Sequence, residues 1–215
     1  MKKQAARPTS AMKVDPAPLQ ALLLAGGHSR RMGKDKSALL YQGQTQLART
    51  IVLLQKLGIP SHLSLRAGQP LPPEARAAEI KPIHDMDQFM DVGPLGGILS
   101  AFAGHPGHAF LILACDLPFL DAKTLEHLIQ NRKPEKLATS FRSHHDGLPE
   151  PLCAIWEPHG EKFLQQKLAE DMRCPRKILI QGETHLLDLP NQEALDNINT
   201  PEDYMDAVAR MGEQN

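Results

Sequence analysis

The chain reads LQALLLAGGHSRRMGKDK from Leu19 to Lys36. Its first part is a short apolar run that ends at a pair of glycines, and such a run predicts a β-strand buried on both faces. The residues that follow are rich in Gly, Ser, Arg and Lys, which indicates a loop. In an open parallel sheet, ligands bind just beyond the carboxyl ends of the strands. We therefore expect this loop to contact a ligand.

Strand–loop–helix units continue along the chain. Apolar runs and alternation predict further strands at 61–65, 79–83, 109–114, 152–156 and 185–189. Helical periodicity and turn signals predict helices at 45–57, 98–103, 121–130, 161–170 and 204–211. Thr200 and Pro201 are typical of the start of the last helix. This alternation predicts an α/β, Rossmann-like three-layer fold with a mainly parallel central sheet and helices on both faces.

The composition favours a single globular domain. Residues 1–17 lack periodicity and predict a flexible N-terminal tail, which leaves one domain over 18–215. The 24 Lys and Arg residues nearly balance the 25 Asp and Glu residues, so no overall basic field favours nucleic acid or an anionic membrane. No apolar run approaches the ~20 residues of a membrane span. The 3 cysteines lack CxxC spacing, which favours reduced thiols and a cytoplasmic location.

The loop after the first strand has the chemistry of an anion site. Arg30, Arg31, Lys34 and Lys36 surround a glycine-rich backbone, and this combination suits the phosphates of a nucleoside triphosphate. Its spacing fits neither a P-loop nor the dinucleotide-binding GxGxxG pattern. By spacing alone, a solvated basic loop is the alternative interpretation.

Longer motifs narrow the interpretation. The segment LAGGHSRRMGKDK at 24–36 resembles the signature of nucleotidyltransferases that activate sugar phosphates and molybdopterin. With two leucines just beyond it, the segment is most similar to that of molybdenum cofactor guanylyltransferases. Other segments agree with this family in order and rough spacing: GPLGGI at 93–98, LACDLPF at 113–119, EPLCAI at 150–155 and NINTPED at 197–203. The resemblance extends over about residues 19–208.

The resemblance implies a reaction and a set of site residues. The reaction is transfer of GMP from GTP to the terminal phosphate of molybdopterin, with Mg²⁺ as cofactor and pyrophosphate as the second product. The implied catalytic residues are Lys36, Arg31 and Asp116, with Asp116 also the metal ligand. The implied nucleotide-binding residues are Leu24, Ala25, Gly26, Gly27, Lys36, Asp85 and Asp116. The implied acceptor-binding residues are Arg30, Asn197 and Asn199.

Elementary chemistry agrees with these roles. Mg²⁺ is typically held by one or two carboxylates together with substrate phosphates, and Asp116 follows the clearest predicted strand, AFLILA at 109–114. Lys36 would neutralise charge that develops at the α-phosphorus. Asp85 would accept from the N1–H and 2-amino groups of guanine. Asn197 and Asn199 flank Ile198 and would share one face of an extended chain. The acceptor phosphate, with a second pKa of about 6, needs no general base at neutral pH.

Alternatives remain open. CTP-using relatives commonly read Ala-Ala-Gly where this chain reads Ala25-Gly26-Gly27, and the missing methyl group leaves room for a purine. This favours GTP over a CTP-dependent molybdopterin cytidylyltransferase. A sugar-phosphate nucleotidyltransferase and a non-enzymatic nucleotide-binding regulatory protein are further alternatives. Transient contacts with cofactor-biosynthesis or molybdoenzyme partners are also expected.

Two groups of residues stay outside the predicted site. Where the family often has an asparagine near the nucleotide, this chain has Arg66, which departs from the pattern. The paired histidines His144-His145 and His105/His108 lack cysteine or acidic partners at ligand spacing, so we interpret them as ordinary surface histidines.

Overall fold

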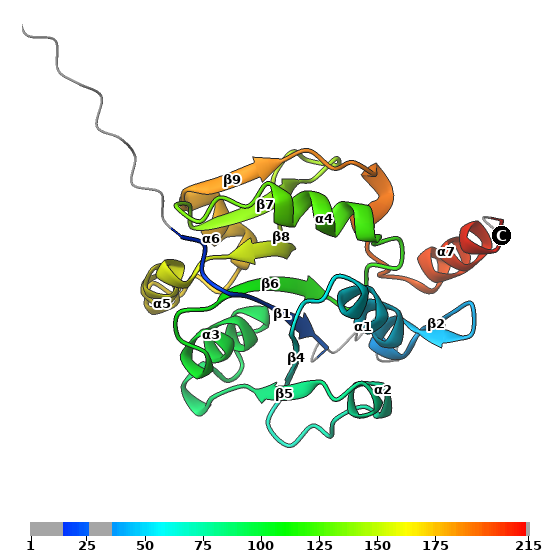
Figure 1. Ribbon diagram of the computed structural model, residues 1–215, viewed down its shortest axis with the longest axis horizontal. Coiled ribbons are helices and arrows are strands. Elements are labelled where there is room, and N and C mark those ends of the chain that lie inside the picture. Colours follow the sequence, from blue (N-terminus) through cyan, green and yellow to red (C-terminus); the bar gives the residue numbers. More distant parts are fainter. Residues whose placement is uncertain (1–14, 26–35, 214–215) are drawn as a thin grey trace, which may run out of the picture.

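The computed structural model describes residues 15–25 and 36–213 (Figure 1). In these ranges a seven-stranded sheet has the order β5-β4-β1-β6-β8-β7-β9. Its strands are β1 (Leu19–Leu24), β4 (Ser61–Leu65), β5 (Lys81–His84), β6 (Ala109–Ala114), β7 (Ala138–Arg142), β8 (Pro149–Trp156) and β9 (Thr184–Leu187). Strand β8 is antiparallel to both of its neighbours, and all other neighbouring pairs are parallel. The prediction of a mainly parallel sheet is confirmed.

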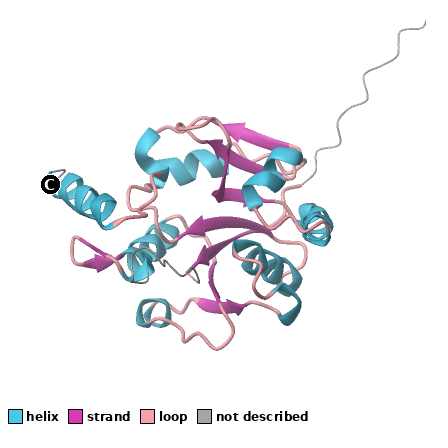
Figure 2. Cartoon of the chain, turned by 180° about the vertical axis from the view of Figure 1, so that it is seen from behind, coloured by secondary structure: helices cyan, strands magenta, loops and turns pink. Residues whose placement is uncertain are grey.

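Helices cover both faces of this sheet (Figures 1 and 2). One face carries α1 (Gln46–Lys56), α2 (Pro73–Ala77) and α4 (Ala122–Gln130), and the other carries α3 (Pro94–Gly104), α5 (Glu161–Ala169) and α6 (Pro175–Gln181). Because side chains alternate along a strand, β1 serves both layers. Its Ala21 and Leu23 pack with the first group of helices, and Leu22 packs with the second. The three-layer arrangement is therefore as predicted.

The C-terminal helix α7 (Pro201–Glu213) belongs to neither layer. It packs on a small ribbon formed by β2 (Leu40–Tyr41) and β3 (Gln44–Thr45), and it lies beside α1 and β2 in Figure 1. Tyr41, Ile198 and Met211 are buried together there, and the Tyr204 hydroxyl donates to the Leu40 carbonyl at 2.8 Å. The C-terminal helix therefore lies next to the segment that directly follows η1 (Lys36–Ala38).

Four short 3-10 helices lie between the strands and α-helices of the described ranges. They are η1 (Lys36–Ala38), η2 (Asp87–Phe89), η3 (Pro158–Gly160) and η4 (Gln192–Leu195). In the part of the chain that the structure describes, every helix is too short or too polar to cross a membrane.

Helix α3 differs from the prediction at its start. The sequence predicts a glycine turn followed by a helix from Ile98, whereas the helix begins at Pro94 and contains Gly96 and Gly97. A Cβ atom at Gly96 would collide with the Phe89 carbonyl oxygen, and one at Gly97 would collide with the Ser64 hydroxyl. These glycines therefore serve close packing inside the helix rather than a turn. Strand β7 and helices α2 and α6 were not predicted at all.

Candidate functional site

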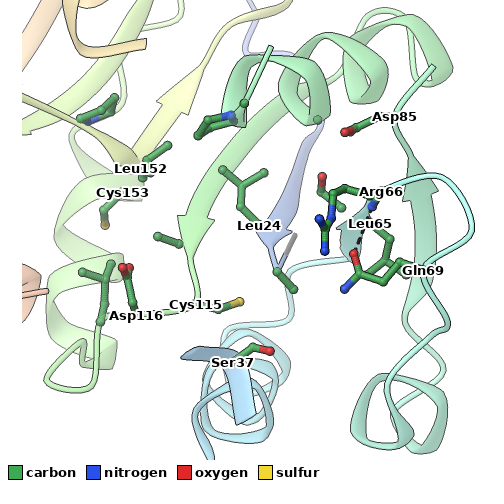
Figure 3. Close-up of a pocket in the computed structure, with 18 of the residues that line it drawn as sticks. Leu24, Ser37, Leu65, Arg66, Gln69, Asp85, Cys115, Asp116, Leu152 and Cys153 are labelled. Carbon is green, nitrogen blue, oxygen red and sulfur yellow. Dashed lines mark hydrogen bonds between the residues drawn. The ribbon is translucent and has the colours of Figure 1, made fainter. Parts of the chain in front are cut away.

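A cavity of about 910 Å³ lies where the parallel strands β1, β4, β5 and β6 end (Figure 3). This is the edge at which the sheet topology places a ligand. Residues at or just beyond these strand ends, and at the start of β8, line the cavity: Leu24, Ala25, Leu65, Arg66, Asp85, Ala114, Cys115, Asp116, Glu150, Leu152 and Cys153. Its volume falls in the usual range of small-molecule sites, which is roughly 300–1,000 Å³.

Strand register brings two predicted segments together. Leu24 of β1 is paired with Ala114 of β6, so Ala25 and Asp116 leave adjacent strands at the same edge. The described residues on either side of the glycine-and-cation loop, Ala25 and Ser37 of η1, both line the cavity. Both ends of the loop therefore border the space that contains Asp116.

Most of the loop itself lies outside the described residues. This applies to the predicted site residues Gly26, Gly27, Arg30 and Arg31. For Lys36 the structure gives the backbone in η1 but not the side chain. Their roles stay predictions.

Asp116 lies next to the segment predicted to bind the acceptor. The Asp116 carbonyl accepts a hydrogen bond from the Ile198 N–H at 3.3 Å, and Asn197 lines the same cavity. Ile198 is buried while Asn197 and Asn199 are exposed, as an alternation along this segment requires. Asn199 is outside the cavity lining, and its N–H donates to the Asp203 carboxylate at 2.9 Å. The structure thus brings Asn197, but not Asn199, to the cavity.

Asp85 has the electrostatics of a binding group. Its backbone N–H donates to the Leu65 carbonyl at 3.1 Å, which fixes its position after β5. Burial raises the pKa of its carboxyl group, and the nearby charge of Arg66 opposes that rise. Its Oδ1 atom is buried and has no hydrogen-bond partner within the described ranges. Because an unpaired buried acceptor is costly, this atom suits a donor supplied by a ligand.

The cavity has two chemically different sides. Figure 3 shows Asp85, Arg66 and Gln69 on one side and Leu152, Cys153 and Asp116 on the other, with Leu24 between them. Gly93 and Pro94, at the N-terminus of the 11-residue helix α3, also line the cavity. A helix N-terminus favours negative groups such as phosphate. The arrangement is compatible with a nucleotide on one side of the cavity and an acceptor on the other.

One lining cation was missed by sequence reasoning. Arg176 of α6 donates to Glu150 at 2.7 Å and to Asp146 at 3.1 Å. No local signal identified it, because α6 is a single short element that the periodicity did not reveal. Arg66, left out of the predicted site, also lines the cavity.

The residues that line the cavity fit a metal-dependent reaction better than one that uses a cysteine thiol as nucleophile. Burial raises the pKa of the Cys153 thiol, which keeps it protonated and a poor nucleophile. Asp116 and Asn197 both offer hard oxygen donors to the cavity, and oxygen ligands are what Mg²⁺ prefers. The donor set on this side therefore fits Mg²⁺.

Comparison with known proteins extends these observations. Residues 21–185 match the profile of a family described as "MobA-like NTP transferase domain". A molybdenum cofactor guanylyltransferase from Pseudomonas fluorescens is 32% identical over 189 residues, which cover 87% of this chain and 92% of that protein. A molybdenum cofactor biosynthesis bifunctional protein from Synechocystis sp. is 35% identical over 195 residues. That match covers 89% of this chain but only 54% of the bifunctional protein, so the chain spans about half of its length.

The fold also has a solved counterpart. The crystal structure of molybdopterin-guanine dinucleotide biosynthesis protein A from Archaeoglobus fulgidus superposes with a TM-score of 0.73 and 22% sequence identity. The superposition covers 90% of this chain and 99% of that one. Most of the chain therefore follows a known α/β architecture.

Proposed function

Because the chain belongs to the family of MobA-like NTP transferase domains, we propose that it transfers GMP from GTP to the terminal phosphate of molybdopterin and releases pyrophosphate. The chain is a nucleotidyltransferase, and its relative from Pseudomonas fluorescens carries the name of this guanylyltransferase. The observation that carries the proposal is the two-sided cavity, with Asp85 on one side and Asp116 on the other.

The Asp85 side suits guanine. The base presents N1–H and a 2-amino group, and a carboxylate accepts from both at once. The Oδ1 atom of Asp85 is buried without a partner in the described structure, and its raised pKa reflects the cost of that burial. Two donors from guanine would offset this cost, whereas the corresponding ring edge of adenine has no such pair of donors.

The Asp116 side suits the polyphosphate and the acceptor. Mg²⁺ held by Asp116 would supply charge neutralisation between the two polyanionic substrates. Lys36 and Arg31 would add positive charge at the α-phosphorus, while Arg30 and Asn197 would hold the acceptor. Asn199 is left out of this role because it lies outside the cavity lining. Arg176 places a further guanidinium on the lining for the acceptor phosphate. These residues bind and orient, and the already ionised acceptor phosphate attacks in line without a general base.

The proposed function also implies a cellular location and binding partners. The 3 cysteines lack CxxC spacing, which favours reduced thiols and supports the proposal of a cytoplasmic location. Its partners would be GTP and molybdopterin, with transient contacts to cofactor-biosynthesis or molybdoenzyme proteins and none to nucleic acid or membranes.

Product analysis tests the proposal. Each of the four ribonucleoside triphosphates is incubated with the protein, Mg²⁺ and molybdopterin, and pyrophosphate and dinucleotide product are measured. We expect both products only with GTP, and we expect chelation of Mg²⁺ to abolish them and added Mg²⁺ to restore them. Turnover with CTP alone would identify a cytidylyltransferase. Turnover with a sugar phosphate in place of molybdopterin, or GTP binding without any product, would reject the proposed acceptor or the catalytic role.

A further inference from the structure

Two adjacent histidines face one carboxylate at the surface. His144 and His145 lie in the turn between β7 and β8, and Asp196 follows η4, 51 residues beyond His145 in the chain. The Nε2 atoms of His145 and His144 lie 3.3 Å and 3.6 Å from the same Asp196 Oδ1 atom. Both histidines lie at the surface, as the sequence predicts, but folding supplies the acidic partner that is missing from the local sequence.

We propose that His144, His145 and Asp196 form a binding site for a divalent transition-metal ion, with Zn²⁺ the best match and water as the fourth ligand. A tetrahedral zinc ion with bonds of about 2.0–2.1 Å holds its ligand atoms about 3.3–3.4 Å from one another. The two observed nitrogen–oxygen distances bracket this separation closely. All three potential ligand atoms lie within 4.8 Å of one another, so only a small closing movement is needed.

Only one of the two histidines is within hydrogen-bond distance of Asp196. The His145–Asp196 distance of 3.3 Å is within hydrogen-bond range, but the 3.6 Å separation from His144 is beyond it. The two imidazole rings also lie close, with centroids 3.7 Å apart and planes tilted by 41°. One proton joins a single nitrogen to the oxygen, whereas a cation between the three groups attracts all of them.

The ligand set distinguishes this site from the one proposed at Asp116. Imidazole nitrogens favour Zn²⁺, Ni²⁺ or Cu²⁺, whereas Mg²⁺ prefers oxygen ligands and several retained waters. The His144 and Asp196 side chains are 29% and 27% exposed, which leaves solvent access for a water ligand. The cavity site and the histidine site would therefore take different ions.

Backbone hydrogen bonds hold the turn that carries the histidines. The Ser143 N–H donates to the Leu148 carbonyl at 2.8 Å, and the Gly147 N–H donates to the Ser143 carbonyl at 2.9 Å. Such a backbone holds ligands near their bound positions and lowers the cost of binding.

An ion at this site would connect two segments that border the cavity. From the same turn, Asp146 bonds Arg176 of the cavity lining at 3.1 Å. Asp196 is followed in the chain by Asn197 and Ile198, and the Ile198 N–H donates a hydrogen bond to the Asp116 carbonyl. Bound Zn²⁺ would thus join the β7–β8 turn to the segment that flanks Asp116.

Metal titration of the full chain tests this inference. The experiment uses a Cys174→Ser background, because Cys174 is an exposed thiol that would compete for zinc. Zn²⁺ alone is titrated by calorimetry and by competition with a chromophoric chelator. We expect one ion per chain, and we expect Asp196→Asn and the double change His144→Ala with His145→Ala each to weaken binding by at least about tenfold. The exposed His159, in η3, provides the matched control as His159→Ala, which should bind like the parent.

Two further readouts exclude a structural explanation. Melting temperatures without metal should agree among all variants, since the changed side chains are largely at the surface. Added Zn²⁺ should slow hydrogen exchange at 143–148 and 196–198 in the parent but not in the variants. Absence of binding in the parent, or equal affinity in the parent and in Asp196→Asn, would overturn the proposed site.

Discussion

At the scale of single residues, Asp85 is the best candidate for reading the base. Asp85→Asn keeps the size of the side chain but replaces one acceptor by a donor that opposes the guanine donors. Since hydrogen bonds to charged groups contribute about 1.5–3 kcal/mol, we expect kcat/KM for GTP to fall by roughly 10- to 100-fold. Steady-state kinetics with GTP measure this effect. Asp87→Asn, an exposed change in the neighbouring turn η2, is the control and should behave like the parent. Unchanged kinetics for Asp85→Asn would remove this residue from the proposed base site.

Asp116 should act on turnover more than on substrate affinity. Asp116→Asn removes the charge proposed to hold Mg²⁺, and loss of electrostatic stabilisation at a reacting phosphate costs on the order of a hundredfold or more in kcat. Lys36→Ala should have an effect of similar size. Single-turnover pyrophosphate release measures both variants against Glu126→Gln, an exposed change on α4. A kcat within about threefold of the parent for Asp116→Asn would contradict the metal role.

The predicted site residues that the structure describes mostly stand where strands end. Ala25, Asp85 and Asp116 each lie within two residues of the end of a predicted strand, so knowing the strands was enough to place them at one edge. Arg176 was missed because the short helix that carries it gives no periodic signal. Asp196 was missed as a partner of His145 because the two residues are 51 positions apart. Contacts between distant segments depend on the final packing, which local patterns do not encode.

At the scale of elements, the interior glycines of α3 have a testable packing role. A Cβ atom at Gly96 would collide with the backbone carbonyl of Phe89, and a backbone atom cannot rotate away. We therefore expect Gly96→Ala to lower the free energy of unfolding by about 1–3 kcal/mol, as overpacking does. Urea denaturation measures the change.

The same helix offers a matched control for that substitution. A Cβ atom at Gly104, the last residue of α3, would meet no neighbouring atom within 4 Å. Because alanine is the better helix former, Gly104→Ala should be neutral or stabilising by up to about 1 kcal/mol. If both alanine variants were equally stable, the Gly96 packing argument would be wrong.

Strands with a regular pattern of apolar residues were predicted correctly, and a strand that buries polar residues was missed. Strands β1, β4 and β6 match their predicted ranges because continuous apolar or alternating patterns mark them. Strand β7 was missed because it buries Thr139 and Ser140. The Ser140 hydroxyl donates to the Glu150 carbonyl at 2.8 Å, and Thr139 accepts from the Lys133 N–H at 2.9 Å. Buried polar residues are tolerated when partners are present, and those partners come from other parts of the fold.

At the scale of the whole molecule, positive and negative charges nearly balance, so two polyanionic substrates would be held by a local site. The net charge is −1, so no general field attracts the substrates. In the proposed function, the attraction would come from the loop cations, the α3 N-terminus and the metal. Of these groups, the α3 N-terminus and the proposed metal ligand Asp116 line the cavity at the carboxyl edge of one sheet. Most of the loop lies outside the described residues. The stability of that sheet therefore underlies the site.

The sheet contains a buried histidine that should make folding sensitive to acid. His62 of β4 is only 7% exposed, and its Nε2 lies 3.0 Å from the Gln20 side chain on β1. Burial, with help from nearby His105, Lys81 and His108, lowers the pKa of His62 to about 4. The unfolded chain binds this proton near pH 6.5, so His62 has little effect on stability above that pH. As the pH falls below about 6.5, protons favour the unfolded state, and the loss continues until the folded pKa is reached.

The expected loss of folding free energy from this one group is roughly 2 kcal/mol between pH 7 and pH 4.5. Urea denaturation over this range measures it as the difference between the parent and His62→Gln, since carboxylates titrate in both proteins and cancel. The variant removes the ionisable ring, so its stability should fall less steeply with acid even if it starts lower at neutral pH. His159→Ala should retain the slope of the parent because that ring is exposed. Parallel curves for the parent and His62→Gln would mean that His62 takes up its proton without opening the sheet.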